Sequence, residues 1–355
     1  MNTSSEKTSV EPITWLNTID RAIIESGQLE ELIDAGVSGV TSAPLAFAHT
    51  VQYRSDYNEL VHRLDGEGKS PREIMEAIVF DDVQLTADYL HSIFASSEGR
   101  NGYVSLDIDP RLQHNHEEIQ AEGLRLAFDV DRANVMVQIP ATPEGIQAMQ
   151  ALIADGVSVN VTHVYTPETY TAVAHAYLAG IRTFLETLDI WRMSPASVVT
   201  VPLHRLNKTI DEMLEQHPNE ESRQLRGQIG IAVGREVYGR FRDIFQGTDW
   251  DDLAKEGAFL QRPLWANSST PVYPDTIRSL SPYRLNTYLH HEPSVREPEN
   301  GREAARVQLN MLADFGIDLA EVERTLQQQA LADLEADFAR LEEDVLVKRD
   351  QLAVM

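Results

Sequence analysis

Polar side chains that could do chemistry fall at or just after the ends of short apolar segments along the chain. A carboxylate can move protons, amides and hydroxyls can hold a carbonyl or hydroxyl group, and an arginine can clamp an anion through paired N–H bonds. In chain order these side chains are Asn17, Thr41, Ser105, Asp107, Gln138, Asn160, Thr162, Thr200, Arg205 and Asn267. Together, side chains of these types at so many segment ends indicate a pocket for a small ligand.

Strand-like segments that alternate with helical patterns are expected to position these residues. In the helical stretch 142–156, Ile146, Met149 and Ile153 recur at helical spacing. Strand followed by helix, repeated eight times, predicts an α/β fold that closes into one (β/α)8 TIM barrel. The strands are expected at 12–17, 37–41, 103–107, 134–139, 157–161, 197–202, 260–265 and 285–289.

Three parts of the chain go beyond this minimal repeat. Residues 44–100 are too long for one crossover and are expected to hold several helices. Residues 319–352 show the pattern of a long amphipathic helix, packed across the barrel or against a neighbour. With residues 1–11 as a flexible N-terminus, we predict a single domain over 12–355.

Polar residues at so many strand ends indicate a pocket. The active sites of such barrels lie at the carboxyl ends of the strands, whereas the packed interior favours Val, Ile and Leu. A buried polar group without a hydrogen-bond partner costs about 1–3 kcal/mol. Any one of these residues could be an ordinary hydrogen-bonded barrel residue, but the set predicts a ligand site.

Composition excludes several other classes of protein. The 355 residues carry a formal net charge of −26, which disfavours a nucleic-acid surface. No apolar run approaches the roughly 18 residues of a membrane span, and the N-terminus lacks the apolar core of a signal peptide. There are no cysteines. We therefore expect a cytoplasmic protein without membrane or nucleic-acid partners, able to form a homo-oligomer, with a small-molecule substrate that could be anionic.

Neither a cofactor nor a metal is expected. No glycine-rich nucleotide fingerprint follows any predicted strand. His114 and His116 lie two apart, but no third ligand is near them in the sequence, so a solvated loop is the simpler interpretation.

Several motifs resemble those of the transaldolase family, over roughly residues 12–345. The resemblance implies a (β/α)8 barrel and a pocket at the strand ends. The motifs are "GVTSAP" at 39–44, "YVSLDIDPRL" at 103–112, "IPATPEGI" at 139–146, "GVSVNVT" at 156–162, "LRGQIGIA" at 225–232, "QRPLWA" at 261–266, "NTYL" at 286–289 and "DFGIDL" at 314–319.

The resemblance places Gln138 where transaldolases carry the lysine that forms a Schiff base with the ketose donor. A desolvated amine is nucleophilic, whereas an amide nitrogen is not. Of the five lysines in the sequence, only Lys208 is expected near the mouth of the barrel. Ordinary transaldolase activity is therefore predicted to be absent or negligible.

Other positions depart from the family pattern but mostly stay polar. Asn160, Thr162 and Arg205 match it, Arg205 at the family's phosphate-binding arginine. The substituted positions are Asn17 for an acid/base aspartate, Asp107 for a glutamate, Ala43 for an asparagine, and Thr200 and Asn267 for serines.

Two hypotheses follow from this pattern. Retained polarity favours a divergent enzyme that performs isomerisation, dehydration, cyclisation or aldol-type chemistry without an imine. In it, Asp107, Gln138, Asn160, Thr162 and Asn17 would be catalytic, and the substrate-binding residues would be Arg205, Thr200, Asn267, Thr41 and Ser105. The alternative is an inactive homologue that serves as a ligand-binding, scaffold or regulatory protein.

Overall fold

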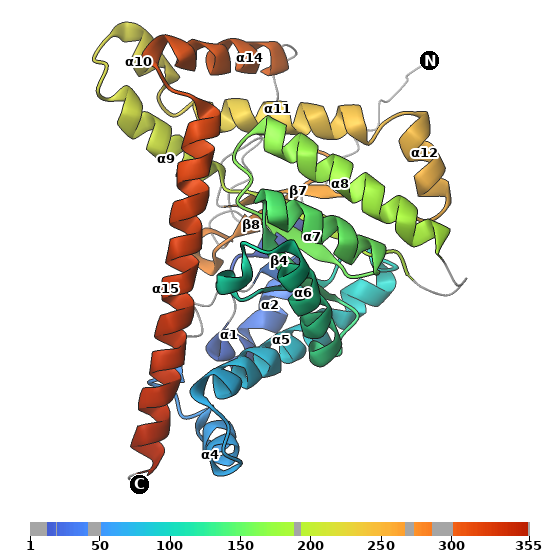
Figure 1. Ribbon diagram of the computed structural model, residues 1–355, viewed down its shortest axis with the longest axis vertical. Coiled ribbons are helices and arrows are strands. Elements are labelled where there is room, and N and C mark those ends of the chain that lie inside the picture. Colours follow the sequence, from blue (N-terminus) through green and yellow to red (C-terminus); the bar gives the residue numbers. More distant parts are fainter. Residues whose placement is uncertain are drawn as a thin grey trace, which may run out of the picture.

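Eight parallel strands form a closed barrel in which each strand pairs with the next and β8 pairs with β1 (Figure 1). The computed structural model describes residues 13–18, 20–41, 51–187, 193–266, 273–285 and 301–353. The strands are β1 (Ile13–Leu16), β2 (Val37–Thr41), β3 (Tyr103–Asp107), β4 (Val135–Pro140), β5 (Val159–Thr162), β6 (Ser197–Val201), β7 (Arg262–Ala266) and β8 (Ile277–Leu280).

Helices surround the barrel, and several begin at residues suited to that place. Thr142 and Thr166 each accept a backbone N–H at a helix start that is followed by proline. The described helices are α1 (Arg21–Glu25), α2 (Gln28–Asp34), α4 (Asn58–Gly66), α5 (Pro71–Ser96), η1 (Pro110–Leu112), α6 (His116–Val130), α7 (Pro143–Ala154), α8 (Pro167–Glu186), α9 (Leu203–Leu214), α10 (Glu220–Leu225), α11 (Ile229–Ile244), α12 (Thr248–Lys255), α14 (Gly301–Met311), η2 (Leu312–Phe315) and α15 (Leu319–Ala353).

The half of the barrel interior nearer the strand starts is apolar and tightly filled. Gly39 has no room for a side chain, because an added Cβ would lie 2.3 Å from the ring of Trp15. This apolar layer consists of Trp15, Tyr103, Met136, Val198, Leu264 and Ile277, all nearly or fully buried. It forms a solid floor beneath the polar strand ends.

The long helix α15 runs along one side of the molecule, from the region of α9 down to α4 (Figure 1). The Glu323 carboxylate accepts hydrogen bonds from the backbone N–H groups of Tyr165 and Thr166, at the start of α8. The Gln327 amide donates to the carbonyl oxygens of Ala141 and His163, which follow β4 and β5. Helix α15 is therefore fastened to loops at the carboxyl end of the barrel.

The structure confirms the predicted barrel, the extra helices and the long C-terminal helix, and it corrects one strand. The eighth strand is Ile277–Leu280 rather than 285–289. Leu285 is helical, and residues 286–289 lie outside the described part of the chain. Strand β8 has only two apolar residues, Ile277 and Leu280. Because the polar Arg278 and Ser279 lie between them, its sequence resembles that of a loop. None of the helices described is long and apolar enough to cross a bilayer.

Candidate active site

Three polar residues stand in one row across neighbouring strands. Asp107 on β3 pairs in register with Gln138 on β4, which in turn pairs with Asn160 on β5. Because neighbouring strands lie about 4.8 Å apart and alternate residues share a face, the three side chains lie on the same, inner face. All three are close to the carboxyl ends of their strands.

Hydrogen bonds connect this row to Ser105 and Thr200. The Gln138 Oε1 atom accepts from Ser105 Oγ at 3.1 Å and from Asn160 Nδ2 at 3.0 Å. Asn160 Nδ2 also lies 3.3 Å from Ser105 Oγ, and Thr200 Oγ1 donates to Asn160 Oδ1 at 2.8 Å. Ser105 and Asn160 are fully buried, and Gln138 is 6% exposed. The network therefore fixes the orientation of the Gln138 amide.

Asp107 is the titratable member of this group. Burial raises the pKa of its carboxyl to about 7, a hydrogen bond with Gln138 opposes this rise, and the negative charge of Asp337 on α15 adds to it. A carboxyl group with a pKa near the working pH can both take up and release a proton, as general acid–base catalysis requires.

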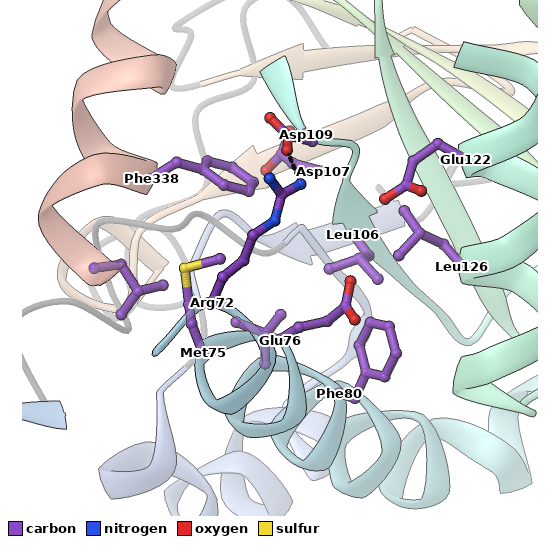
Figure 2. Close-up of a pocket in the computed structure, with 12 residues that line it drawn as sticks. Arg72, Met75, Glu76, Phe80, Leu106, Asp107, Asp109, Glu122, Leu126 and Phe338 are labelled. Atoms are coloured by element: carbon purple, nitrogen blue, oxygen red, sulfur yellow. Dashed lines mark hydrogen bonds and ion pairs between the residues drawn. The ribbon is translucent and has the colours of Figure 1, made fainter. Parts of the chain in front are cut away.

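A small apolar cavity lies beside Asp107, between the end of β3 and helices α5, α6 and α15 (Figure 2). Met75, Phe80 and Phe338 are among its lining residues. Its volume of about 50 Å³ has room for only a few water molecules, so it does not hold a sugar. Charged side chains, among them Arg72, Glu76 and Glu122, also line it.

Asp109, two residues after Asp107, would face the barrel interior if the strand continued, but it does not. It lies beyond the end of β3 and forms ion pairs with Arg72 and Arg111 (Figure 2 shows the pair with Arg72). The strand ends at Asp107, so the alternation no longer applies two residues later.

Three further predicted residues lie at the ends of β1, β2 and β5. Thr41 Oγ1 donates to the Leu16 carbonyl at 3.3 Å, and Thr162 Oγ1 donates to the Ile139 carbonyl at 3.4 Å. These two hydroxyls therefore bridge neighbouring strands. Asn17 differs, because its Oδ1 atom is a buried acceptor without a hydrogen-bond partner among the described residues.

Arg205, in the first turn of α9, forms an ion pair with Asp333 of α15. Its Nη2 atom lies 2.8 Å from Asp333, and their side chains are 37% and 66% exposed. His163 lies close to this pair. Burial, together with the positive charge of Arg205, lowers the pKa of His163 to about 4, although Asp333 opposes the shift. His163 is therefore neutral at physiological pH.

None of the four described lysines lines the polar half of the barrel. Lys69, Lys208 and Lys255 each face an acidic residue of their own helix region at the protein surface. Lys208 in particular has a side chain 70% exposed beside Glu212. Lys348 is buried, but it donates to the Arg54 carbonyl oxygen where α15 packs near α4. Lys7 lies outside the described residues.

Sequence reasoning missed the part that α15 takes in the site. Asp333 and Asp337 reach Arg205 and the surroundings of Asp107 from a helix more than a hundred residues away. The amphipathic pattern predicted the helix, but no local signal tells where it docks. Ala43 and Asn267 lie outside the described residues. Within the described ranges no group of three or more His, Asp or Glu side chains could hold a metal ion.

A closed parallel barrel with its buried polar network at the carboxyl ends of the strands defines the class: a (β/α)8 barrel of the kind that carries an active site at that end. Comparison with known proteins identifies the family. The model of the transaldolase/fructose-6-phosphate aldolase family matches residues 14–345, and the chain belongs to this family.

Individual relatives align along almost the whole chain. A protein named transaldolase from Saccharopolyspora erythraea is 35% identical over 353 residues, which cover 95% of each chain. A transaldolase from Thermobifida fusca is 33% identical and covers 89% of this chain and 90% of its own. Transaldolase 1 from Streptomyces avermitilis is 34% identical, with 93% and 91% covered.

Proposed function

We propose that this transaldolase-family protein is an enzyme that works without a Schiff base on a small polyhydroxylated or carbonyl compound. The observation that carries the proposal is the pair of Asp107 and Gln138, a carboxyl with a pKa near 7 beside an amide that cannot act as a nucleophile. The resemblance to transaldolases places Gln138 at the position where those enzymes carry the lysine that forms the Schiff base.

In this mechanism Asp107 is the general base and acid. As a carboxylate it takes the proton from the hydroxyl-bearing carbon next to the substrate carbonyl, which gives an enediolate, and as the acid it returns that proton to the former carbonyl carbon. The proton of the adjacent hydroxyl passes to the former carbonyl oxygen, so the carbonyl and the hydroxyl exchange places and the substrate is isomerised. The Gln138 amide, held by Ser105 and Asn160, keeps the carboxyl in place. The buried, unbonded Oδ1 atom of Asn17 is proposed to accept a hydrogen bond from a substrate hydroxyl once the side chain turns toward the pocket. Dehydration, cyclisation or aldol-type chemistry would use the same proton transfers.

An anionic substrate would meet Arg205 only by displacing or sharing Asp333. Thr200 and Asn160, already joined by a hydrogen bond, and Thr162 and Thr41 are proposed to shape the pocket rather than to bind an anion. The expected cytoplasmic location and a homo-oligomeric state also stay predictions.

The ion pair between Arg205 and Asp333 also favours a second candidate function. An arginine that is already neutralised by the chain's own carboxylate fits an inactive homologue that serves as a ligand-binding, scaffold or regulatory protein. In that case the polar network would only bind a ligand or support the barrel.

Two experiments distinguish the enzyme from the inactive homologue: a search for ligands that stabilise the protein, and then the isosteric substitution Asp107→Asn. The thermal midpoint is measured with sugars, sugar phosphates and small keto or carboxylic acids, and a ligand at 100 times its dissociation constant adds about 2.7 kcal/mol of stability. The stabilising compound is then incubated in D2O, and solvent exchange or conversion is followed by NMR. An enzyme loses this turnover in Asp107→Asn and keeps it in Asp34→Asn, a matched change on the exposed face of α2.

Binding without turnover, unchanged by Asp107→Asn, would establish the scaffold hypothesis instead. Borohydride reduction in the presence of a ketose, followed by mass spectrometry, tests the absence of an imine. A covalent adduct on any lysine would contradict the lysine-independent mechanism.

A further inference from the structure

A second cavity, of about 540 Å³, lies at the opposite, amino end of the barrel. Its lining includes Ile13, Ser197 and Arg262, which are the first residues of β1, β6 and β7, together with Arg100 and Asn101, which precede β3. This volume is within the range of about 300–1,000 Å³ that is typical of small-molecule sites. It is ten times larger than the cavity beside Asp107.

A buried arginine lines this cavity, and no carboxylate among the described residues forms an ion pair with it. Arg262 is 9% exposed, and within the described ranges it forms no ion pair. Its Nη1 atom donates to Asn101 Oδ1 at 2.9 Å, and its Nη2 atom donates to the Arg100 carbonyl oxygen at 2.6 Å. A guanidinium has five N–H groups, so three remain beyond these two bonds. Buried charges in proteins are normally paired, whereas the two acceptors that hold this one within the described part of the chain are neutral.

The other groups at the cavity divide into polar and apolar walls. Ser197 Oγ accepts a hydrogen bond from Gln261 Nε2, which leaves its own proton able to point elsewhere. Arg100 stands at the rim with a side chain 59% exposed, lies over the ring of Phe259, and pairs with Glu98. Trp250 adds a second aromatic surface. One carboxylate, Asp275, also lines the cavity, and it acts on Arg262 only through space.

We propose that this amino-end cavity binds a small organic anion, with its carboxylate or phosphate group against Arg262 and its apolar body against Phe259 and Trp250. Arg262 supplies N–H donors in the fork geometry that suits either group. The site lies at the opposite end of the barrel from Asp107 and Gln138, so it is separate from the proposed catalytic pocket. Its occupant would be a regulatory or stabilising ligand rather than the substrate.

Binding to the full-length protein, measured by calorimetry and thermal midpoint, tests the proposal with four probes. Benzoate and phenyl phosphate carry both features, benzamide lacks the charge, and inorganic phosphate lacks the apolar body. We expect the two organic anions to bind at least about tenfold more tightly than benzamide and inorganic phosphate, which corresponds to about 1.4 kcal/mol. Equal binding of all four probes, or no binding of either organic anion, would overturn the proposal.

Three variants locate the binding. Arg262→Met removes the charge, but it also removes two internal hydrogen bonds and could impair folding. Ala254→Trp fills the cavity from the exposed side of α12 and leaves every polar group in place. We expect both to weaken binding of the organic anions at least about tenfold, and Arg63→Met, at an exposed arginine of α4 outside both sites, to leave it unchanged. Binding that survives Ala254→Trp, or that is lost in Arg63→Met, would overturn the proposal.

Discussion

The apolar floor and the polar mouth of the barrel are built on the same strands. On a given strand, the inward-facing residue of the floor and that of the mouth are two positions apart. Trp15 is followed two residues later by Asn17, Met136 by Gln138, and the same change from apolar to polar occurs on other strands. The pairs are Trp15 and Asn17, Met136 and Gln138, Val198 and Thr200, and Ile277 and Ser279. The first member of each pair belongs to the floor and the second faces the mouth. Substitutions in the floor and in the mouth of the same strand can therefore test packing and site chemistry separately.

The largest effect is expected from the floor. Trp15→Ala removes a fully buried side chain that fills the space above Gly39. The free energy of unfolding should fall by about 3–5 kcal/mol, since the cavity cannot close completely. Urea denaturation followed by circular dichroism measures this loss. A loss below about 1 kcal/mol would mean that the floor is not the tightly packed layer described above.

A smaller loss of stability is expected in the polar half. Gln138→Leu leaves the Ser105 hydroxyl and the Asn160 amide without their shared acceptor, at a cost of about 1–3 kcal/mol. The same change removes a hydrogen bond that lowers the pKa of Asp107, so this pKa should rise further above about 7. NMR titration of the Asp107 carboxyl carbon measures it. An unchanged or lowered pKa would contradict the arrangement of Gln138 beside Asp107.

The titration of Asp107 should also appear as a pH dependence of stability. Its pKa is raised from an unfolded value near 3.8 to about 7, so its protonated form favours the folded state. This contribution is fully present below the unfolded pKa and is lost as pH rises toward 7, by at most about 1.4 kcal/mol per pH unit. Burial also raises the pKa of Asp82 to about 7. The test is therefore the difference between the wild type and Asp107→Asn, which should change in favour of the variant between about pH 4 and 7.

The smallest change in stability is expected at the surface ion pair. Arg205→Met should lower the free energy of unfolding by no more than about 1 kcal/mol, because both partners are well exposed. Lys208→Met on the same helix is a matched control, since Lys208 is farther from its partner at 3.9 Å. Asp333→Ala should strengthen binding of anionic compounds at the mouth of the barrel, as calorimetry can measure. If it weakens their binding, Asp333 does not compete for Arg205.

Most of the barrel could be predicted because its strands carry a local pattern. Seven strands lie within about two residues of their expected positions, and the row of Asp107, Gln138 and Asn160 follows from strand alternation and register. The eighth strand was predicted wrongly because Arg278 is buried against expectation for its type. The contacts of Asp333 and Asp337, and the burial of Arg262 beside Asn101 at the amino end, depend on tertiary packing. No local sequence pattern encodes them.

The fastening of α15 has a consequence for synthesis of the chain. The residues that cap α8 and hold the loops after β4 and β5 belong to a helix that begins at residue 319 of 355. A ribosome that has completed all eight strands has not yet released the partners of those loops. The backbone N–H groups of Tyr165 and Thr166 stay without the Glu323 carboxylate until residue 323 has been synthesised. Premature termination before residue 319 would therefore leave the loops after β4 and β5 without the hydrogen bonds that Glu323 and Gln327 make with them.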